Sequence, residues 1–359
     1  MTHSATAANE STSPTFPLVG IGASAGGLEA ISELMADIPA ASGMAFLVVQ
    51  HLDPYRHSLL PEILAKRVPI RVVEAVEGMD VEVDHLYVIP ANTSMSVVER
   101  RIRLRPRDDA LGPPMPIDDL LDSLAKDQGP NAIGVVLSGS GSDGALGLQA
   151  IQHEGGITFA QDEMSAHFNS MPHAAISLGC VDRVLAPRGI AKEIMGIGRH
   201  PYLRSVRAPA TGAPIEPAET SLRTIFRLLR SACNIDFSRY KNGTVQRRLS
   251  RRMALHQLTS IADYVRVLET DPAETLALGR DLLIQVTEFF RDPETFDVLK
   301  QTVFPRLTSG SDFSGPLRIW VPGCATGEEV YSIAICLMEY LVLLCHKTYG
   351  IIGASSSFA

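Results

Sequence analysis

The sequence predicts an α/β protein with a doubly wound, mainly parallel sheet, followed by a small all-α domain and by the incomplete start of a second α/β unit. Three observations predict this order. Between residues 17 and 195, apolar runs typical of buried strands alternate with helical segments. Residues 221–300 are mainly helical in pattern, and residues 301–345 hold one strand-like run, a glycine-containing turn and one helical run. Strands that are apolar on both faces and separated by helices indicate a parallel sheet covered on both sides.

The elements of the first region can be placed in order along the chain. The predicted strands are PLVGIG (17–22), AFLVVQ (45–50), HLYVIP (85–90), AIGVVLSG (132–139) and GGITFAQ (155–161). The helical segments between them include residues 28–38, 59–68 and 117–128. Because crossovers between parallel strands are right-handed, the loops that follow these strands should share one edge of the sheet, where α/β proteins build their sites.

The composition is that of an ordinary globular chain. Of the 359 residues 45% are apolar, and the net charge of −8 argues against bulk binding to nucleic acid or to a membrane. Residues 1–16 are small and polar, so we expect a disordered arm and no signal peptide. The most apolar run, residues 332–345, is too short to span a bilayer. Five scattered cysteines predict neither disulfides nor a metal site and fit a reducing cytoplasm.

The second half of the chain separates its charges. Residues 199–220 are rich in Pro, Ala and Thr, which is typical of a linker. Residues 221–256 then hold nine Arg or Lys against one Asp, a net charge of +8. Residues 263–299 hold nine acids against three bases, a net charge of −6.

The basic segment forms one predicted helix. Arg247 and Arg251, like Arg248 and Arg252, are four residues apart and so share a helix face. Three interpretations are open: a solvated face, a surface for nucleic acid, or a docking site for an acidic protein. The acidic neighbouring segment and the scarcity of aromatic residues disfavour nucleic acid.

The stretch GIGASAGGLEAI, residues 20–31, follows the first strand and opens the first helix. Gly20, Gly22 and Gly26 approximate the phosphate-binding fingerprint of dinucleotide-binding proteins. However, the third glycine is one residue late, and the second strand does not end in an acid that could bind ribose hydroxyls. A dinucleotide site is therefore the weaker of two interpretations.

The stronger interpretation makes Ser24 a nucleophile, because Gly22, Ser24 and Gly26 also match G-x-S-x-G. Such a turn exposes the hydroxyl at a helix N-terminus, where the N–H of Ala25 can stabilise an oxyanion. A nucleophilic serine needs a base and an orienting acid. Taken singly, the strand-end His51 and the loop residue Asp143 are ordinary features. Since both follow strands of the same predicted sheet, we expect them to meet Ser24.

These motifs carry a resemblance to a known family. GIGASAGGLEAI, VVQHLDP, LSGSGSDGALG and FAQDEMSAHFNSMPHAAI resemble the catalytic domain of the chemotaxis protein-glutamate methylesterases, the CheB family, over residues 17–195. The resemblance implies hydrolysis of glutamyl methyl esters on methyl-accepting chemotaxis receptors, deamidation of certain receptor glutamines, and no cofactor. It also implies that Ser24 is the nucleophile, His51 the general base and Asp143 the orienting acid.

The same resemblance implies an oxyanion site and a pocket beside the triad. The residues expected there are Ala25, Gly139, Ser140, Gly141 and the turn Met171–Pro172. The family often has Thr in place of Ala25 and Met in place of Ser140, so we expect a different rate or pocket shape. Family members usually carry a receiver domain of the phosphorelay before the esterase. Sixteen polar residues cannot supply one, so we expect no control by phosphorylation within this chain.

A second resemblance covers the rest of the chain. FSRYKNGTVQRRLSRRM, LLIQVTEFFRDPETF and IWVPGCATGEEVYSIAI resemble the CheR family, the chemotaxis receptor glutamate methyltransferases that use S-adenosylmethionine. It implies a helical domain that docks receptors through Arg247, Arg248, Arg251 and Arg252, and a Rossmann-like cofactor domain. The implied cofactor-binding residues are Thr287, Arg291, Gly323, Thr326 and Glu328. Since an isolated βα unit cannot enclose a cofactor, we predict an incomplete site without transferase activity.

The sequence therefore predicts a methylesterase joined to a broken methyltransferase. The predicted divisions are a disordered arm (1–16), a CheB-type methylesterase domain (17–198), a linker (199–220), a CheR-type helical domain (221–300), a truncated methyltransferase start (301–345) and a tail (346–359). The expected partners are the cytoplasmic domains of methyl-accepting chemotaxis receptors. Two alternatives remain open: a receptor-binding adaptor without catalysis, and a nucleotide-binding oxidoreductase.

Overall fold

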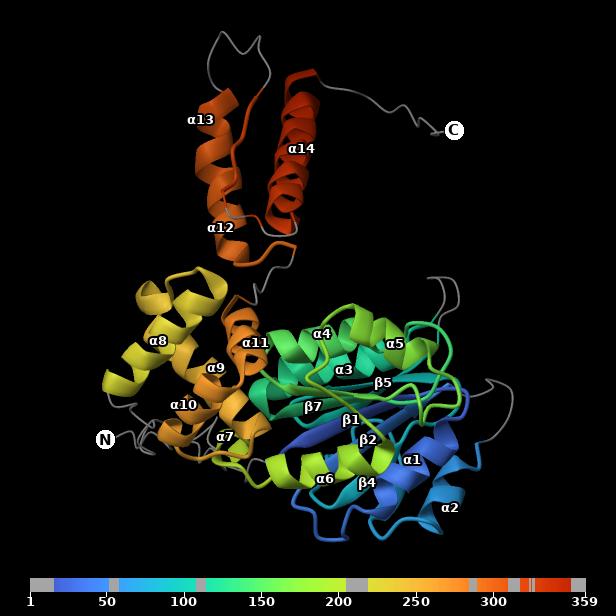
Figure 1. Cartoon of the computed structure of the whole chain (residues 1–359). Helices are drawn as coiled ribbons and strands as arrows, with labels where there is room; N and C mark the ends of the chain where they lie inside the picture. The colour runs from blue at the N-terminus through green and yellow to red at the C-terminus, as the bar shows by residue number, and fades with distance from the viewer. Residues whose placement is uncertain are drawn as a thin grey trace, which may run out of the picture. The chain divides into compact units, whose positions relative to one another are not determined.

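The computed structural model describes residues 16–51, 58–107, 114–204, 219–283, 289–308, 317–322, 324 and 327–349. The chain divides into two compact units, one up to Leu283 and one from Ile284 onward (Figure 1). Most of the predicted arm and of the predicted tail lies outside the described residues.

The first unit is built on a seven-stranded sheet with the order β3-β4-β2-β1-β7-β8-β9. All neighbouring strands pair in parallel. The strands are β1 (Leu18–Ala23), β2 (Ala45–Gln50), β3 (Arg71–Glu74), β4 (His85–Val88), β7 (Ala132–Val136), β8 (Ile157–Gln161) and β9 (Arg183–Leu185). The chain order reverses at β1, between β2 and β7, and this is the place where doubly wound sheets bind their ligands.

The predicted doubly wound sheet is confirmed, and β1, β2, β4, β7 and β8 are the five predicted strands. The sequence did not reveal the edge strands β3 and β9. They are short and only partly buried, with side chains such as Arg71 and Glu74 exposed, so they lack the apolar run that marks a central strand.

Helices cover both faces of the sheet (Figure 1). One core includes side chains of α1 (Gly27–Ala36), α2 (Leu60–Ala65) and α6 (Pro187–Ile197). The other core includes side chains of α3 (Pro116–Gln128), α4 (Ala145–His153) and α5 (Ser170–Ser177). The sequence pattern predicted helices that alternate with strands buried on both faces, and the structure has both. Pro lies near the start of several of these helices, where its missing N–H costs nothing.

Two glycines of β1 explain how α3 approaches the sheet. A Cβ atom on Gly20 would lie 2.6 Å from Leu124 Cδ1, and one on Gly22 would lie 2.2 Å from Ile117 Cγ2. Both separations are shorter than side chains tolerate, so α3 can lie directly on β1 only because these positions have no side chain. The glycines therefore serve helix packing, and the dinucleotide interpretation loses its basis.

A hairpin that the sequence did not reveal packs against α3. Strands β5 (Thr93–Val98) and β6 (Arg101–Pro106) pair antiparallel in a separate two-stranded sheet. Met95, Val97 and Ile102 bury one face of this hairpin in the core that α3 also lines. In β6 three arginines alternate with Ile102, Leu104 and Pro106, so the segment looked polar and the strand was missed.

The first unit ends in a helical bundle. It comprises α8 (Glu219–Cys233), α9 (Asn242–Leu255), α10 (Ile261–Thr270) and α11 (Pro272–Leu283), which share a core of their own. Within the predicted linker, residues 201–204 form the short helix α7 (Pro201–Arg204). Its Tyr202 and Leu203 are buried in the core that α1, α2 and α6 also line, so this part of the predicted linker belongs to the folded domain.

The second unit is small. It contains α12 (Pro293–Val298), a π-helical turn (Leu299–Val303), α13 (Phe304–Thr308) and α14 (Glu328–Tyr349). Phe296, Phe304 and Cys336 form its core. No helix in the described part of the chain is both long and apolar enough to cross a membrane.

The predicted strand in the run LRIWV is wrong. Residues 317–322 adopt no strand, and Trp320 is 87% exposed. A strand needs a neighbour that accepts its backbone hydrogen bonds. The described residues of the second unit include no other strand, so the apolar run has nothing to pair with.

Candidate active site

The carboxyl ends of β1, β2 and β7 bring Ser24, His51 and Asp143 together. Ser24 and His51 directly follow β1 and β2, and Asp143 lies in the loop after β7. Ser24 Oγ lies 3.1 Å from His51 Nδ1, and His51 Nε2 lies 2.7 Å from Asp143 Oδ2. In the tautomer that donates from Nε2 to the carboxylate, Nδ1 is free to accept the hydroxyl proton of Ser24.

The carboxylate of Asp143 is held by the N-terminus of α3. Its Oδ2 accepts a hydrogen bond from the N–H of Ile117 at 3.0 Å, and its Oδ1 accepts one from the N–H of Asp118 at 2.9 Å. Asp143 is only 2% exposed. A helix N-terminus favours a negative charge, so these donors stabilise the buried carboxylate and hold it toward His51.

The turn that carries Ser24 is fixed by its backbone. Gly26 adopts a left-handed conformation with φ of 72°, which favours glycine because a side chain would strain it. Ser24 N–H donates to the carbonyl of Ser138 at 3.0 Å. Among the described residues, the N–H of Ala25 has no acceptor. The N–H of Ala25, which the G-x-S-x-G turn predicted as an oxyanion donor, is therefore available beside Ser24.

The predicted pocket residues lie around this turn, with one difference. A Cβ atom on Gly139 would lie 2.9 Å from Ser24 Cβ, so the loop approaches the serine closely. The N–H of Gly139 donates to the carbonyl of Phe168 and that of Gly141 to Ser170 Oγ. Ser140 and Gly141 are both exposed. Met171 and Pro172 were expected in a turn. Because α5 begins at Ser170, they lie in the first turn of that helix instead, and both are buried.

Among the described residues, two other histidines of this domain are exposed, and neither forms a hydrogen bond with Ser24. His173 Nδ1 lies 2.9 Å from Glu163 Oε1, and both side chains are exposed. His167 is exposed in the loop before α5, and His57 lies outside the described residues. A buried acid, an imidazole and a serine joined by hydrogen bonds are typical of the serine hydrolases.

Sequence reasoning missed the residues that support this arrangement. Ile117 and Asp118 hold Asp143 through backbone N–H groups, which carry no side-chain signature. The backbone N–H of Ser138 donates to Gln161 Oε1 at 2.8 Å, which joins the ends of β7 and β8. The only available signals were Pro116 at a helix start and polar residues at strand ends.

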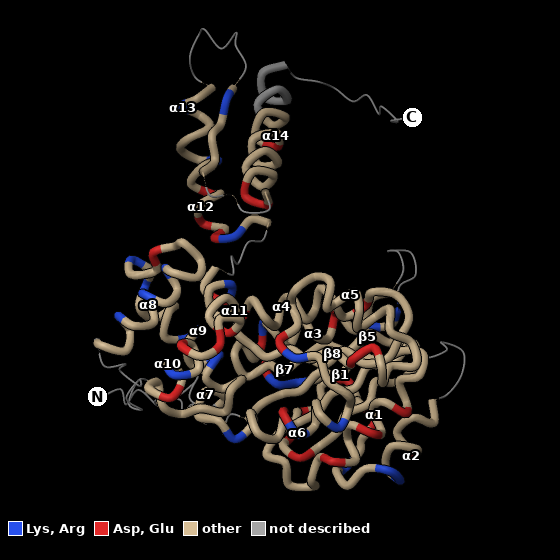
Figure 2. Tube along the Cα trace, viewed as in Figure 1, with Lys and Arg blue, Asp and Glu red and all other residues tan. Residues whose placement is uncertain are grey.

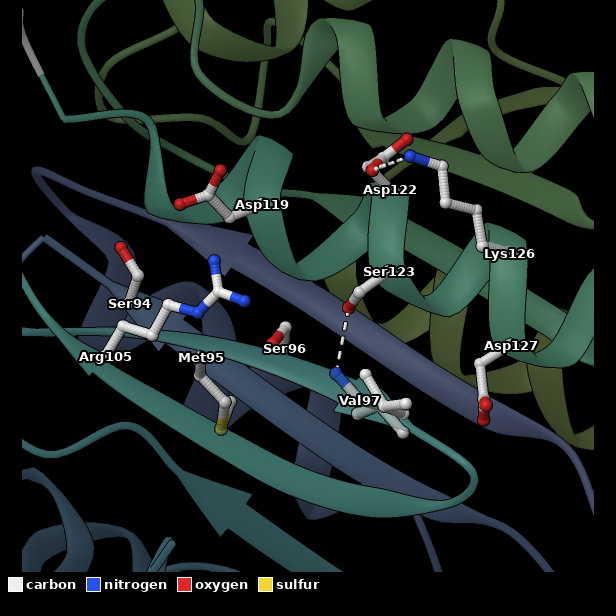
Figure 3. Close-up of a pocket in the computed structure, with 11 residues that line it drawn as sticks. Ser94, Met95, Ser96, Val97, Arg105, Asp119, Asp122, Ser123, Lys126 and Asp127 are labelled. Atoms are coloured by element: carbon white, nitrogen blue, oxygen red, sulfur yellow. Dashed lines mark hydrogen bonds and ion pairs between the residues drawn. The ribbon is translucent and has the colours of Figure 1, made fainter. Parts of the chain in front are cut away.

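A groove elsewhere on the first unit is separate from this site. A cavity of about 540 Å³ lies between β5 and α3 (Figure 3). Its lining includes Ser94, Ser96, Arg105, Asp119, Asp122 and Lys126. None of Ser24, His51 and Asp143 lines it, so the groove and the triad are separate features.

The predicted docking arginines require a correction. Arg248, Arg251 and Arg252 are buried, and only Arg247 is exposed. Arg251 donates to the carbonyl of Gly156 at 2.9 Å and pairs with Asp182 and Asp281.

The neighbours of Arg251 are also satisfied within the first unit. Arg248 donates to the carbonyls of Gln152 and His153, and Arg252 forms an ion pair with Glu274. Figure 2 shows basic and acidic positions on the helices of this bundle. Backbone carbonyls hold Arg248, and carboxylates distant in sequence neutralise Arg251 and Arg252. The prediction that these three buried arginines dock a receptor is therefore wrong.

The residues expected to bind S-adenosylmethionine do not form a site in the described residues. Thr287, Gly323 and Thr326 lie outside them. Arg291 is exposed, and Glu328 is the first residue of α14. A cofactor of this kind sits at the carboxyl edge of a sheet. The described part of this unit has no strand, so these residues are not placed at such an edge.

Comparisons with known proteins identify the families. Residues 19–194 match the family model of the CheB methylesterase. Residues 220–283 match the all-alpha domain of the CheR methyltransferase, and residues 285–357 match its SAM binding domain. The chain therefore joins a domain of the CheB methylesterase family to domains of the CheR methyltransferase family, as the two resemblances predicted.

Similar proteins agree with this assignment. An "uncharacterized 104.1 kDa protein in hypE 3'region" of Rhodobacter capsulatus is 36% identical over 299 residues, which make up 78% of this chain and 31% of that protein. A "protein-glutamate methylesterase/protein-glutamine glutaminase" of Photorhabdus laumondii is 36% identical over 182 residues, 50% of this chain and 52% of that protein. The chain thus spans about half of the latter relative and about a third of the former.

One solved structure is also similar. The CheB methylesterase catalytic domain of Thermotoga maritima is 26% identical, with a TM-score of 0.47, and the match covers 50% of this chain and 98% of that one.

Proposed function

We propose that the first domain hydrolyses glutamyl methyl esters of a protein substrate, with Ser24, His51 and Asp143 as its catalytic triad. The observation that carries the proposal is the hydrogen-bonded series from Ser24 Oγ through His51 to the buried Asp143, at the switch point of the sheet. The match of residues 19–194 to the CheB methylesterase model supports the substrate class.

In the proposed first step, Ser24 Oγ attacks the ester carbonyl while His51 Nδ1 takes the hydroxyl proton. The imidazolium that forms is stabilised by the carboxylate of Asp143, which α3 keeps in place. The negative charge that develops on the carbonyl oxygen lies beside the N–H of Ala25. The tetrahedral adduct collapses, and methanol leaves with the proton that His51 holds.

In the second step, water hydrolyses the acyl-enzyme. His51 takes a proton from the water, and the hydroxide adds to the acyl carbon. Ser24 Oγ then leaves with the proton from His51, and the substrate is released as a glutamate side chain. A primary amide in place of the ester would follow the same course with ammonia as the leaving group. The second half of the name of the Photorhabdus relative, protein-glutamine glutaminase, supports that extension.

We infer that the protein substrates are the cytoplasmic domains of methyl-accepting chemotaxis receptors and that the chain acts in the cytoplasm. The match of residues 19–194 to the CheB methylesterase model supports this choice, because the motifs of this domain resemble those of chemotaxis enzymes. Of the four arginines first considered for docking, only the exposed Arg247 can contribute to binding such a partner.

We also infer that the 359-residue chain transfers no methyl group, although residues 285–357 match a SAM binding domain. The absence of a strand among the described residues of the second unit and the exposure of Trp320 support this inference. Titration calorimetry with S-adenosylmethionine should therefore give no binding heat. Saturable binding would contradict the inference.

The decisive experiment is methanol release from a methylated receptor cytoplasmic fragment. The Ser24→Ala chain should lose activity by several orders of magnitude, since removal of a triad member has that effect. Ser42→Ala is a matched control, because Ser42 lies in a loop before β2 and bonds to Asp84. Receptor binding without methanol release from the unmodified chain would favour the adaptor interpretation instead.

A further inference from the structure

The two peptide groups next to Ala25 are held from opposite sides. The carbonyl of Ser24 accepts hydrogen bonds from Gly27 N–H at 2.9 Å and from Gln50 Nε2 at 3.4 Å. The carbonyl of Ala25 accepts one from Ser138 Oγ at 2.8 Å. In a trans peptide the N–H points opposite to the carbonyl. With the Ser24 carbonyl fixed on one side, the N–H of Ala25 is directed to the other.

Ser138 is the centre of these contacts, and it is 1% exposed. Its hydroxyl donates to Ala25 and at the same time accepts from the N–H of Phe168 at 3.0 Å. Its backbone carbonyl accepts from Ser24 N–H, and its backbone N–H donates to Gln161. Every polar group of this residue is therefore engaged, and the partners lie in three different segments.

The fit around the hydroxyl leaves little freedom. A Cβ atom on Gly26 would lie 2.8 Å from Ser138 Oγ and 3.0 Å from His167 Cβ. Because Gly26 has no side chain, the turn after β1 lies against the Ser138 hydroxyl, and the loop that contains Phe168 closes on its other side. The hydroxyl thus joins the turn of the nucleophile to the loop that leads into α5.

We propose that Ser138 is a positioning residue that holds the Ser24–Ala25–Gly26 turn, so that the N–H of Ala25 meets the developing oxyanion. The proposal rests on the proposed esterase function. Ser138 touches no reacting atom in this scheme, and it acts by fixing the donor. An oxyanion-site donor is effective only when it is already in place as the charge forms, so a small displacement reduces kcat more than it affects substrate binding.

The role needs a hydroxyl group, because one atom must donate to Ala25 and accept from Phe168. Ser138→Ala removes both bonds, whereas Ser138→Thr retains the hydroxyl. Ser123 provides a matched control. Its hydroxyl also donates to a carbonyl, that of Leu120 at 2.7 Å, and accepts from an N–H, that of Val97 at 3.0 Å. Ser123→Ala thus removes the same kind of bridge away from the triad.

The test measures kcat, KM and the thermal midpoint of unfolding for the full chain and these three variants, with methanol release from a methylated receptor fragment. Ser138→Ala should lower kcat by about 10- to 100-fold, less than the loss of a direct donor, with KM changed by less than about 3-fold. Ser138→Thr should restore kcat to within about 5-fold. Ser123→Ala should lower the midpoint comparably and leave kcat unchanged.

Two results would overturn the proposal. One is an equal kcat for Ser138→Ala and Ser123→Ala at similar thermal midpoints, which would make Ser138 a structural residue only. The other is a loss in KM alone. The rate at which a fluorophosphonate probe labels Ser24 is measured in parallel and should fall with kcat. If the unmodified chain releases no methanol, the esterase proposal fails, while the labelling rates still decide the role of Ser138.

Discussion

Arg251 of α9 and Asp182, which lies directly before β9, form an ion pair from which solvent is excluded. The two side chains are 0% and 2% exposed. Burial opposes the charge of Arg251, but Asp182 and Asp281 raise the pKa of its guanidinium, so it remains a cation. The same guanidinium donates to the carbonyl of Gly156, directly before β8. A charge of the helical bundle is thus neutralised at the edge of the sheet.

Replacement of this arginine should destabilise the first unit strongly. Arg251→Met leaves Asp182 and Asp281 buried without their cation, and the loss of one partner of a buried pair costs about 3–5 kcal/mol. The free energy of unfolding in urea measures this effect. Arg247→Met on the exposed side of the same helix is the control and should change it by less than about 0.5 kcal/mol. Equal effects would mean that the buried pair contributes nothing specific.

The contact between Gly22 and α3 gives a second prediction. Gly22→Ala places a Cβ atom 2.2 Å from Ile117 Cγ2, so α3 must shift, and overpacking of this kind costs about 1–3 kcal/mol. Esterase activity should fall as well, because the N–H of Ile117 holds Asp143. Gly243→Ala is the control, since no atom lies within 4 Å of the added Cβ. A Gly22→Ala chain of unchanged stability would show that α3 adjusts freely.

Asp143→Asn should reduce kcat by about 10⁴-fold, the usual effect of losing the orienting acid. An amide that donates to His51 Nε2 forces the ring proton onto Nδ1, where it faces Ser24 and blocks proton transfer. Steady-state methanol release gives kcat. Asp122→Asn, an exposed residue of α3 that pairs with Lys126, should leave it unchanged. Full activity of the Asp143→Asn chain would remove Asp143 from the mechanism.

Asp118 gives a prediction for pH. Burial, together with the charge of Asp143, raises the pKa of Asp118 from 3.8 to about 6. The folded chain therefore binds this proton more tightly than the unfolded chain. The stability that the group contributes is complete below pH 3.8 and is lost as the pH rises through about 6. Thermal midpoints across this range should fall for the unmodified chain relative to Asp118→Asn. A difference that stays constant with pH would contradict the prediction.

The central strands and the residues that follow them could be predicted from the sequence, because the types of their side chains identify them. Central strands such as β1 and β7 are apolar on both faces, and Ser24 and His51 follow strands directly. The support of Asp143 was not predictable in the same way. Its donors are backbone N–H groups of α3, and their positions depend on how α3 lies over Gly22.

The arginines of α9 show the opposite difficulty. Their spacing was read correctly as helical, but a run of positive charge does not reveal whether its partners lie in another molecule or in the same chain. Asp182 and Asp281 lie 69 and 30 residues from Arg251. No local pattern connects them, so only the folded chain shows that the charges neutralise one another.

The buried arginines also bear on how the protein can be divided. A fragment that ends at residue 198, the predicted limit of the esterase domain, would lack Tyr202, whose hydroxyl donates to Gly155, as well as Arg248 and Arg251. The carbonyls at the start of β8 and the carboxylate of Asp182 would then face water at a newly opened surface. The boundary between the residues that match the two families is therefore not a boundary between independently folded domains. We expect the smallest fragment that folds on its own to extend to Leu283.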